Sequence, residues 1–215
     1  MVSTNMKYSL ILVSLIFALI VSAQQNNNDD IFTAVKNNNI ERINSLLSNG
    51  LNVNQKRAED GATPLHVAVT FASVEMVNIL LSKGANVNAQ LTRILDTPLH
   101  LAVDEKNVKI ATLLIAKGAD VNAKDEHGYT PLMLAPGKEI TELLIKAGAD
   151  INAKGKDGYT PLHFVMDAES AKLLLQKGAN PNARAEDGFT PTDLARETAV
   201  RFGDSEVYTV LKNAK

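Results

Sequence analysis

The chain contains no cysteine among its 215 residues. This absence excludes disulfide bonds, thiolate metal sites, a cysteine nucleophile and a lipid anchor attached through cysteine. It leaves the redox compartment open, because a fold without cysteine tolerates oxidising and reducing surroundings alike.

The chain also lacks an excess of charge of one sign. Its 22 lysines and arginines nearly balance 24 aspartates and glutamates, which gives a formal net charge of -2. Binding to nucleic acid or to an anionic membrane depends on a surplus of positive charge. We therefore expect neither as a partner, while a hydrophobic content of 45% is sufficient for a folded core.

The motifs of the common enzyme classes are missing. The sequence has no Gly-x-Ser-x-Gly elbow, no phosphate-binding glycine-rich loop, no His-Glu-x-x-His pair and no dinucleotide fingerprint. Acidic residues are plentiful, but they fall in predicted turns, where solvation and turn hydrogen bonds account for them. We predict no catalytic residues, no cofactor and no metal site.

One long apolar run lies near the N-terminus. Lys7 precedes the apolar run over residues 10–21, and Val21-Ser22-Ala23 then places small or compact residues before a possible cleavage site. This order predicts a secretory signal peptide over residues 1–23, followed by a polar spacer over residues 24–28. A retained membrane anchor is the alternative, but a span needs about 20 apolar residues and the polar spacer begins too early. We expect a bacterial protein exported to the periplasm or secreted, free of the membrane after cleavage.

The rest of the chain is dominated by one recurring motif. Self-similarity at a fixed period of tens of residues predicts a solenoid of stacked units rather than a single core built from distant contacts. The Thr-Pro pairs that mark the motif lie 34, 33, 30 and 30 residues apart, beginning at Thr63, Thr97, Thr130, Thr160 and Thr190.

Each repeat is predicted to form two helices. Thr97 is a helix N-cap, and Pro98 suits the first helical position, where its missing N–H is not needed. Gly118 is predicted to end the second helix in the left-handed conformation. The apolar positions recur at helical spacing, at Leu99, Ala102 and Val103 and then at Val108, Ala111, Leu114 and Ile115.

The motif Thr-Pro-Leu-His-x-Ala, in register with glycines at the helix ends, resembles the ankyrin repeat family. The resemblance covers residues 29–215. It implies an all-α solenoid of about six helix-turn-helix units, including two caps, joined by β-turn fingers that line a concave face. The expected units are residues 29–57, 58–92, 93–125, 126–155, 156–185 and 186–215.

Three histidines share one slot of the motif. They lie on successive units about 10 Å apart, whereas zinc ligands converge on one point. The resemblance implies a structural role for these histidines and for the motif threonines. The residues of this set are Thr63, His66, Thr97, His100, Thr130, Thr160, His163 and Thr190.

The residue before each Thr-Pro pair varies, and we expect binding there. Aromatic side chains at Tyr129, Tyr159 and Phe189 form a ladder that supplies binding energy at low entropic cost, or each ring covers its own turn. The unusual finger over residues 90–96 is apolar at Leu91, Ile94 and Leu95; these side chains either form a contact surface or pack on neighbouring turns. The predicted partner-binding residues are Tyr129, Tyr159, Phe189, Asp96, Ile94, Leu91, Glu126, His127, Asp157 and Asp187.

Two units are three residues short, those that begin at Thr130 and Thr160. We expect the loss between the helices, so that Pro136-Gly137 and Asp167-Ala168 turn at once. Either the shortening reshapes the binding wall, or it is a deletion that turns of such arrays tolerate.

These observations favour a monomeric, non-enzymatic module that binds another exported protein through its concave face, as a scaffold, inhibitor or immunity-type protein. Two alternatives stay open: an accessory to an envelope stress or peroxide-defence enzyme, and a secreted effector that binds a host protein.

Overall fold

The computed structural model describes residues 31–71, 73–202 and 206–214. Within these ranges every regular element is a helix and there is no strand, which confirms the all-α solenoid. The predicted signal peptide (1–23) and spacer (24–28) lie outside the described residues.

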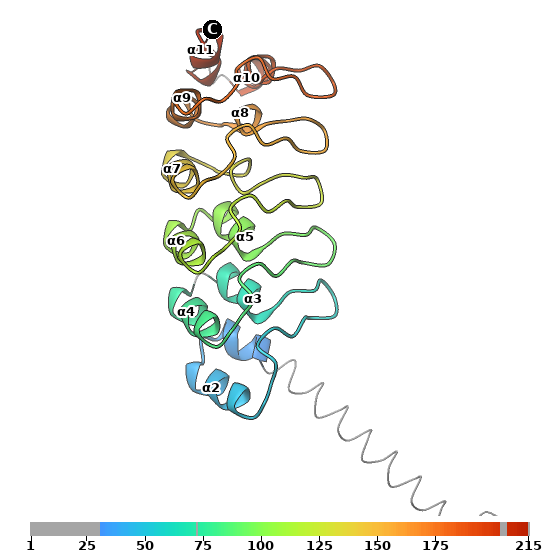
Figure 1. Ribbon diagram of the computed structural model, residues 1–215, viewed down its shortest axis with the longest axis vertical. Coiled ribbons are helices and arrows are strands. Elements are labelled where there is room, and N and C mark those ends of the chain that lie inside the picture. Colours follow the sequence, from blue (N-terminus) through green and yellow to red (C-terminus); the bar gives the residue numbers. More distant parts are fainter. Residues whose placement is uncertain (1–30, 72, 203–205, 215) are drawn as a thin grey trace, which may run out of the picture.

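The helices stack in two columns, with loops that project to one side as fingers (Figure 1). The first column holds the first helix of each unit and lies next to the fingers, and the second column lies behind it. A helical segment over residues 31–36 precedes α2 (Ile40–Ser48), α3 (Pro64–Thr70), α4 (Val74–Ser82), α5 (Pro98–Asp104), α6 (Val108–Ala116), α7 (Lys138–Lys146), α8 (Pro161–Phe164), α9 (Ala168–Gln176), α10 (Pro191–Phe202) and α11 (Glu206–Lys212).

The third unit shows why these residues form helices. Thr97 is extended (φ -92°, ψ 165°), and its hydroxyl accepts a hydrogen bond from the backbone N–H of His100. At the far end Gly118 has φ +88°, its N–H donates to the carbonyl of Ile115, and the next N–H donates to that of Leu114. This pair of bonds is a Schellman motif, which requires the left-handed residue that glycine supplies.

The core runs between the two columns as one continuous layer. Leu99 from α5 and Ile110 and Leu114 from α6 are 0% exposed, and equivalent positions of neighbouring units continue the layer. Each unit therefore buries apolar side chains both between its own two helices and against the neighbouring unit, as expected of a solenoid.

The structure corrects where the two short units lose their residues. The second helices α7 and α9 keep nine residues, whereas α8 has four instead of the seven of α3 and α5, and residues 131–134 form only a turn. Pro136 disfavours helical geometry at the residue before it. Asp167 is extended because it N-caps α9, accepting from the N–H of Ser170 at 2.8 Å. The first helices must end early to leave room for these starts.

Candidate partner-binding surface

The fingers are held in register by one backbone hydrogen bond between each pair of neighbours. These bonds place the finger tips beside the first helices on one side of the stack, here called the finger face (Figure 1). They run from the N–H groups of Thr92, Glu126, Lys156 and Glu186 to the carbonyls of Asp60, Ile94, His127 and Asp157, at 2.8–3.0 Å.

Two of the predicted aromatic residues also connect neighbouring fingers. The hydroxyl of Tyr129 donates to the carboxylate of Asp157, and that of Tyr159 donates to Asp187. The bond to Asp187 and partial burial raise the pKa of Tyr159 to about 12, while burial, followed by the bond to Asp157, raises the pKa of Tyr129. Both hydroxyls therefore remain protonated donors at physiological pH.

The rings of these tyrosines meet around Phe164. The ring of Tyr129 lies 4.9 Å from that of Phe164 and the ring of Tyr159 lies 5.6 Å from it, both in edge-to-face geometry. All three residues are half-buried, so each ring keeps an exposed part. We call Tyr129, Tyr159 and Phe164 the aromatic cluster; Phe189, also half-buried, lies one finger further along.

Phe164 was missed from the sequence. In the complete units the position of Phe164, three residues after the motif proline, is occupied by the aliphatic residues Val67 and Leu101. The replacement of an aliphatic residue by an aromatic one in a shortened unit was the available signal.

The unusual finger has an exposed apolar tip. Ile94 is 42% and Leu95 36% exposed, while Leu91 is half-buried. Leu95 has φ +57° in the slot where four other units have glycine. A leucine in this left-handed region costs roughly 1–2 kcal/mol relative to ordinary geometry, so the tip is held in a strained conformation.

Two of the four predicted acidic residues, Asp96 and Glu126, lie beside this tip. A hollow of about 320 Å³ is lined by Ile94, Asp96, Asp125, Glu126 and other residues of the finger face. Desolvation, reinforced by the neighbouring carboxylates, raises the pKa of Asp96 to about 6. His127 is exposed, with its ring 5.6 Å from that of Tyr129.

Most of the chain matches models of one protein family. A family model of ankyrin repeats, in three copies, matches residues 10–91, 31–125 and 91–155, and a model of the single ankyrin repeat matches residues 157–186. The chain belongs to the ankyrin repeat family. A search of curated proteins finds no match to it. Ankyrin repeats are in general non-enzymatic modules that bind other proteins, and no catalytic family is indicated.

The ankyrin histidines join one unit to the next. In His66, Nδ1 accepts from the backbone N–H of Thr63 at 3.2 Å, so the hydrogen is on Nε2, which donates to the carbonyl of Asp96 at 3.3 Å. His100 and His163 repeat this arrangement with the carbonyls of Tyr129 and Phe189. Burial lowers the pKa of all three, because the imidazolium would lose solvation.

The fourth unit lacks this connection, because Met133 takes the histidine slot. Within the described residues, the hydroxyl of Thr130 is one of three buried side-chain oxygens without a hydrogen-bond partner. In the last unit Asp193 replaces histidine, and the hydroxyl of Thr190 donates to its carboxylate at 2.6 Å. Thr130 is thus the motif threonine that the sequence leaves unsatisfied.

A second set of connections between ankyrin units was not foreseen. The side chain of Asn122 donates to the carbonyl of Gly148 at 3.2 Å and accepts from the N–H of Asp150 at 2.8 Å. Asn54, Asn88 and Asn152 make the same pair of bonds to their next units. The recurrence of asparagine at one position after each helix-ending glycine was the signal that could have identified them.

No group of three or more histidine and acidic side chains within the described ranges is arranged to hold a metal ion. In the same part of the chain, none of the helices has both the length and the apolar character that crossing a bilayer requires.

Proposed function

We propose that the chain is an exported binding protein that holds another exported protein on its finger face, as a scaffold, inhibitor or immunity-type protein. The observation that supports this most directly is the aromatic cluster. Its half-buried residues are followed by half-buried Phe189 in the next finger, and Ile94 of the apolar tip lines a hollow together with Tyr129. Such rings supply much of the energy of protein interfaces.

The aromatic cluster is also preorganised. Tyr129 and Tyr159 are each fixed by a hydrogen bond to the next finger and by ring contacts with Phe164. Binding a partner therefore freezes little additional side-chain motion, which lowers the entropic cost of association. The carboxylates of Asp157 and Asp187 beside the rings favour a partner with basic residues at its rim.

Capture from the native cell envelope fraction tests the binding function. The bait is the full chain, compared with a variant that carries Tyr129→Ala, Tyr159→Ala and Phe189→Ala. Tyr208→Ala is the matched control, because it removes a half-buried tyrosine ring from α11, away from the fingers. We expect one protein that the wild type and the control retain and the triple variant loses. Equal recovery by all three baits would contradict the proposed site.

Export is tested separately by the mass of the protein isolated from its native host. The proposal gives a mature N-terminus at Gln24 and recovery outside the cytoplasm. An uncleaved chain in the cytoplasmic fraction would contradict export and leave the binding surface unaffected.

A further inference from the structure

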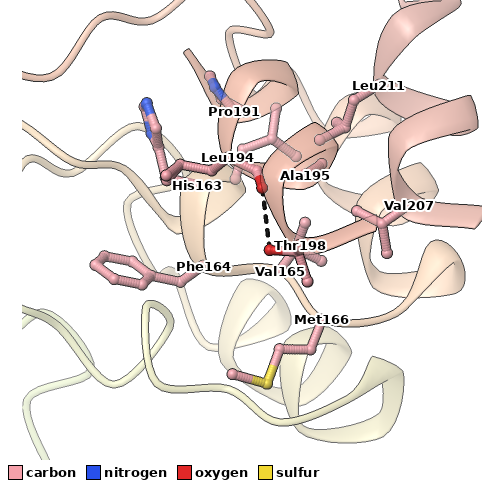
Figure 2. A pocket seen from close by; sticks show the side chains of 11 residues that line it. His163, Phe164, Val165, Met166, Pro191, Leu194, Ala195, Thr198, Val207 and Leu211 are labelled. Carbon is pink, nitrogen blue, oxygen red and sulfur yellow. Dashed lines mark hydrogen bonds between the residues drawn. The ribbon is translucent and has the colours of Figure 1, made fainter. Parts of the chain in front are cut away.

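A pocket of about 440 Å³ opens between α8, α10 and α11. Figure 2 shows it framed by residues that follow α8 on one side and by the two last helices on the other. Its walls are mainly apolar and include Val165, Met166, Leu194, Ala195, Val207 and Leu211.

The pocket exists because α8 is too short to cover α10. In the complete units the fifth residue counted from the motif proline, Val69 or Val103, is 0% exposed. The residue at the corresponding place after α8 is Met166, which is 78% exposed, because the chain leaves the helix to reach the N-cap Asp167. A helix of twelve residues, α10, thus faces a helix of four.

The polar groups in the wall are already used within the fold. The hydroxyl of Thr198 donates to the carbonyl of Leu194 at 3.0 Å (Figure 2). Both ring nitrogens of His163 are engaged, Nδ1 with Thr160 and Nε2 with the carbonyl of Phe189. A polar group that entered the pocket would lose water without gaining a partner of this kind. The part of a ligand that enters is therefore apolar.

Carboxylates lie near residues that line the pocket: Glu197 shares an adjoining hollow with Leu194 and Thr198. Phe164 lines the pocket and touches Tyr159, whose hydroxyl lies within electrostatic reach of Asp157, Asp187 and Glu197. Arg201 lines an adjoining hollow with Glu197 and offsets part of this charge. The field at the mouth favours positive charge on a bound molecule.

We propose that the pocket takes one large apolar side chain, aromatic or branched aliphatic, from a lysine- or arginine-rich segment of the partner protein. The volume lies within the range of about 300–1,000 Å³ typical of ligand pockets. This inference rests on the proposed function, since it names the chemistry of one segment of the proposed partner.

The test uses defined peptides and the full chain, labelled with ¹³C in the methyl groups of leucine, valine and methionine. The probe is a nine-residue peptide with a central phenylalanine and lysines around it; the comparison peptides carry a central serine, or glutamates in place of the lysines. We expect saturable shifts of the signals of Met166, Leu194, Val207 and Leu211. A central serine should weaken binding at least tenfold, and glutamate flanks at least fivefold at low salt, where charge is least screened.

Two variants of α10 locate the binding. Thr198→Phe places a ring over the pocket from an exposed position and should weaken binding of the phenylalanine peptide at least tenfold. The matched control Val200→Phe adds the same ring at a position that is 85% exposed and should change affinity less than twofold. An unchanged backbone amide spectrum shows that each variant is folded.

Three results would overturn the proposal. The first is that the methyl signals of the pocket do not shift with the phenylalanine peptide at millimolar concentration, and the second is that they shift with benzene but with none of the peptides. The third is that these signals shift with the concentration of the chain alone, which indicates a second copy as the occupant. The peptides need no natural partner. Binding at the pocket while the capture experiment fails would contradict only the proposed function, and the reverse outcome would contradict only this inference.

Discussion

At the scale of the residue, the most informative difference between units is the methionine in the histidine slot of the fourth. His163 makes its bonds to Thr160 and to the next finger in the fifth unit, which is equally short. The shortening therefore does not forbid these bonds at residue 133. What the fourth unit lacks is the ring, and the hydroxyl of Thr130 stays without a partner.

Met133→His should raise the free energy of unfolding by about 1 kcal/mol, because it pairs a buried hydroxyl and adds a bond to the next finger. Urea denaturation measures the change. Met133→Leu is the control, with a similar apolar volume and no ring nitrogen, and should bring no gain. Equal stability of the two variants would show that the missing hydrogen bonds make no net contribution to the free energy of unfolding.

Acid should destabilise the fold through its buried histidines. A group with a lowered pKa in the folded state binds fewer protons there, so its contribution is complete above pH 6.5 and is lost as the pH falls. Each histidine contributes a slope of at most about 1.4 kcal/mol per pH unit. His66→Met should flatten the dependence of the unfolding free energy on pH between 6.5 and 5.

Asp96 changes the pH dependence of stability in the opposite direction. Its pKa of about 6 is raised, so the folded state takes up this proton first and acidification below pH 6 favours folding through this group. Asp96→Asn should therefore steepen the loss of stability in acid. Slopes that neither variant changes would contradict both assignments.

At the scale of the element, neighbouring units are joined by hydrogen bonds as well as by apolar contacts. Each of the four junctions from the first unit to the fifth carries an asparagine bridge, and two of these four junctions add a histidine. The junction between the fourth and fifth units has the bridge of Asn152, but Met133 takes the place of a histidine there. This part of the stack should be the most sensitive to loss of an asparagine.

Asn152→Ala should cost about 1–2 kcal/mol of unfolding free energy, since it removes two bonds between units. Asn182→Ala is the matched control: in the described residues its side chain makes no bridge of this kind, and the change should cost less than about 0.5 kcal/mol. Thermal or urea unfolding of both variants gives the comparison. A cost at Asn152 no larger than at Asn182 would show that the asparagine bridges do not stabilise the stack.

The sequence predicted those elements whose signals are local. Thr97 and Pro98 start a helix, and Gly118 ends one, through bonds to residues at most a few positions away. The asparagine bridges depend on residues about 30 positions away in the next unit, and the role of Phe164 depends in part on Tyr129 in the preceding unit. Composition does not reveal such contacts. The prediction that the two short units lose residues between their helices was wrong, because the first helices are the shortened elements. Local signals fix where α7 and α9 begin, whereas no local signal marks where the first helices end.

At the scale of the whole molecule, each unit of a stack contacts only its neighbours. The local stability of each part therefore depends on the unit itself and on its junctions with the adjacent units. The turn over residues 131–134 replaces a helix, and the pocket beside α8 leaves apolar surface uncovered. Native-state hydrogen exchange should show faster exchange in residues 131–136 than in α5. Equal protection of the two segments would mean that the stack unfolds as one unit.

The central claim is that the residues of the finger face that differ from unit to unit, rather than the recurring repeat motif, carry the function. The most direct measurement is hydrogen exchange of the full chain with and without the protein recovered by capture. We predict added protection in the fingers over residues 90–96, 124–129, 154–159 and 184–189, with little change in the second-column helices α4, α6, α7 and α9. Protection confined to that second column would contradict the claim.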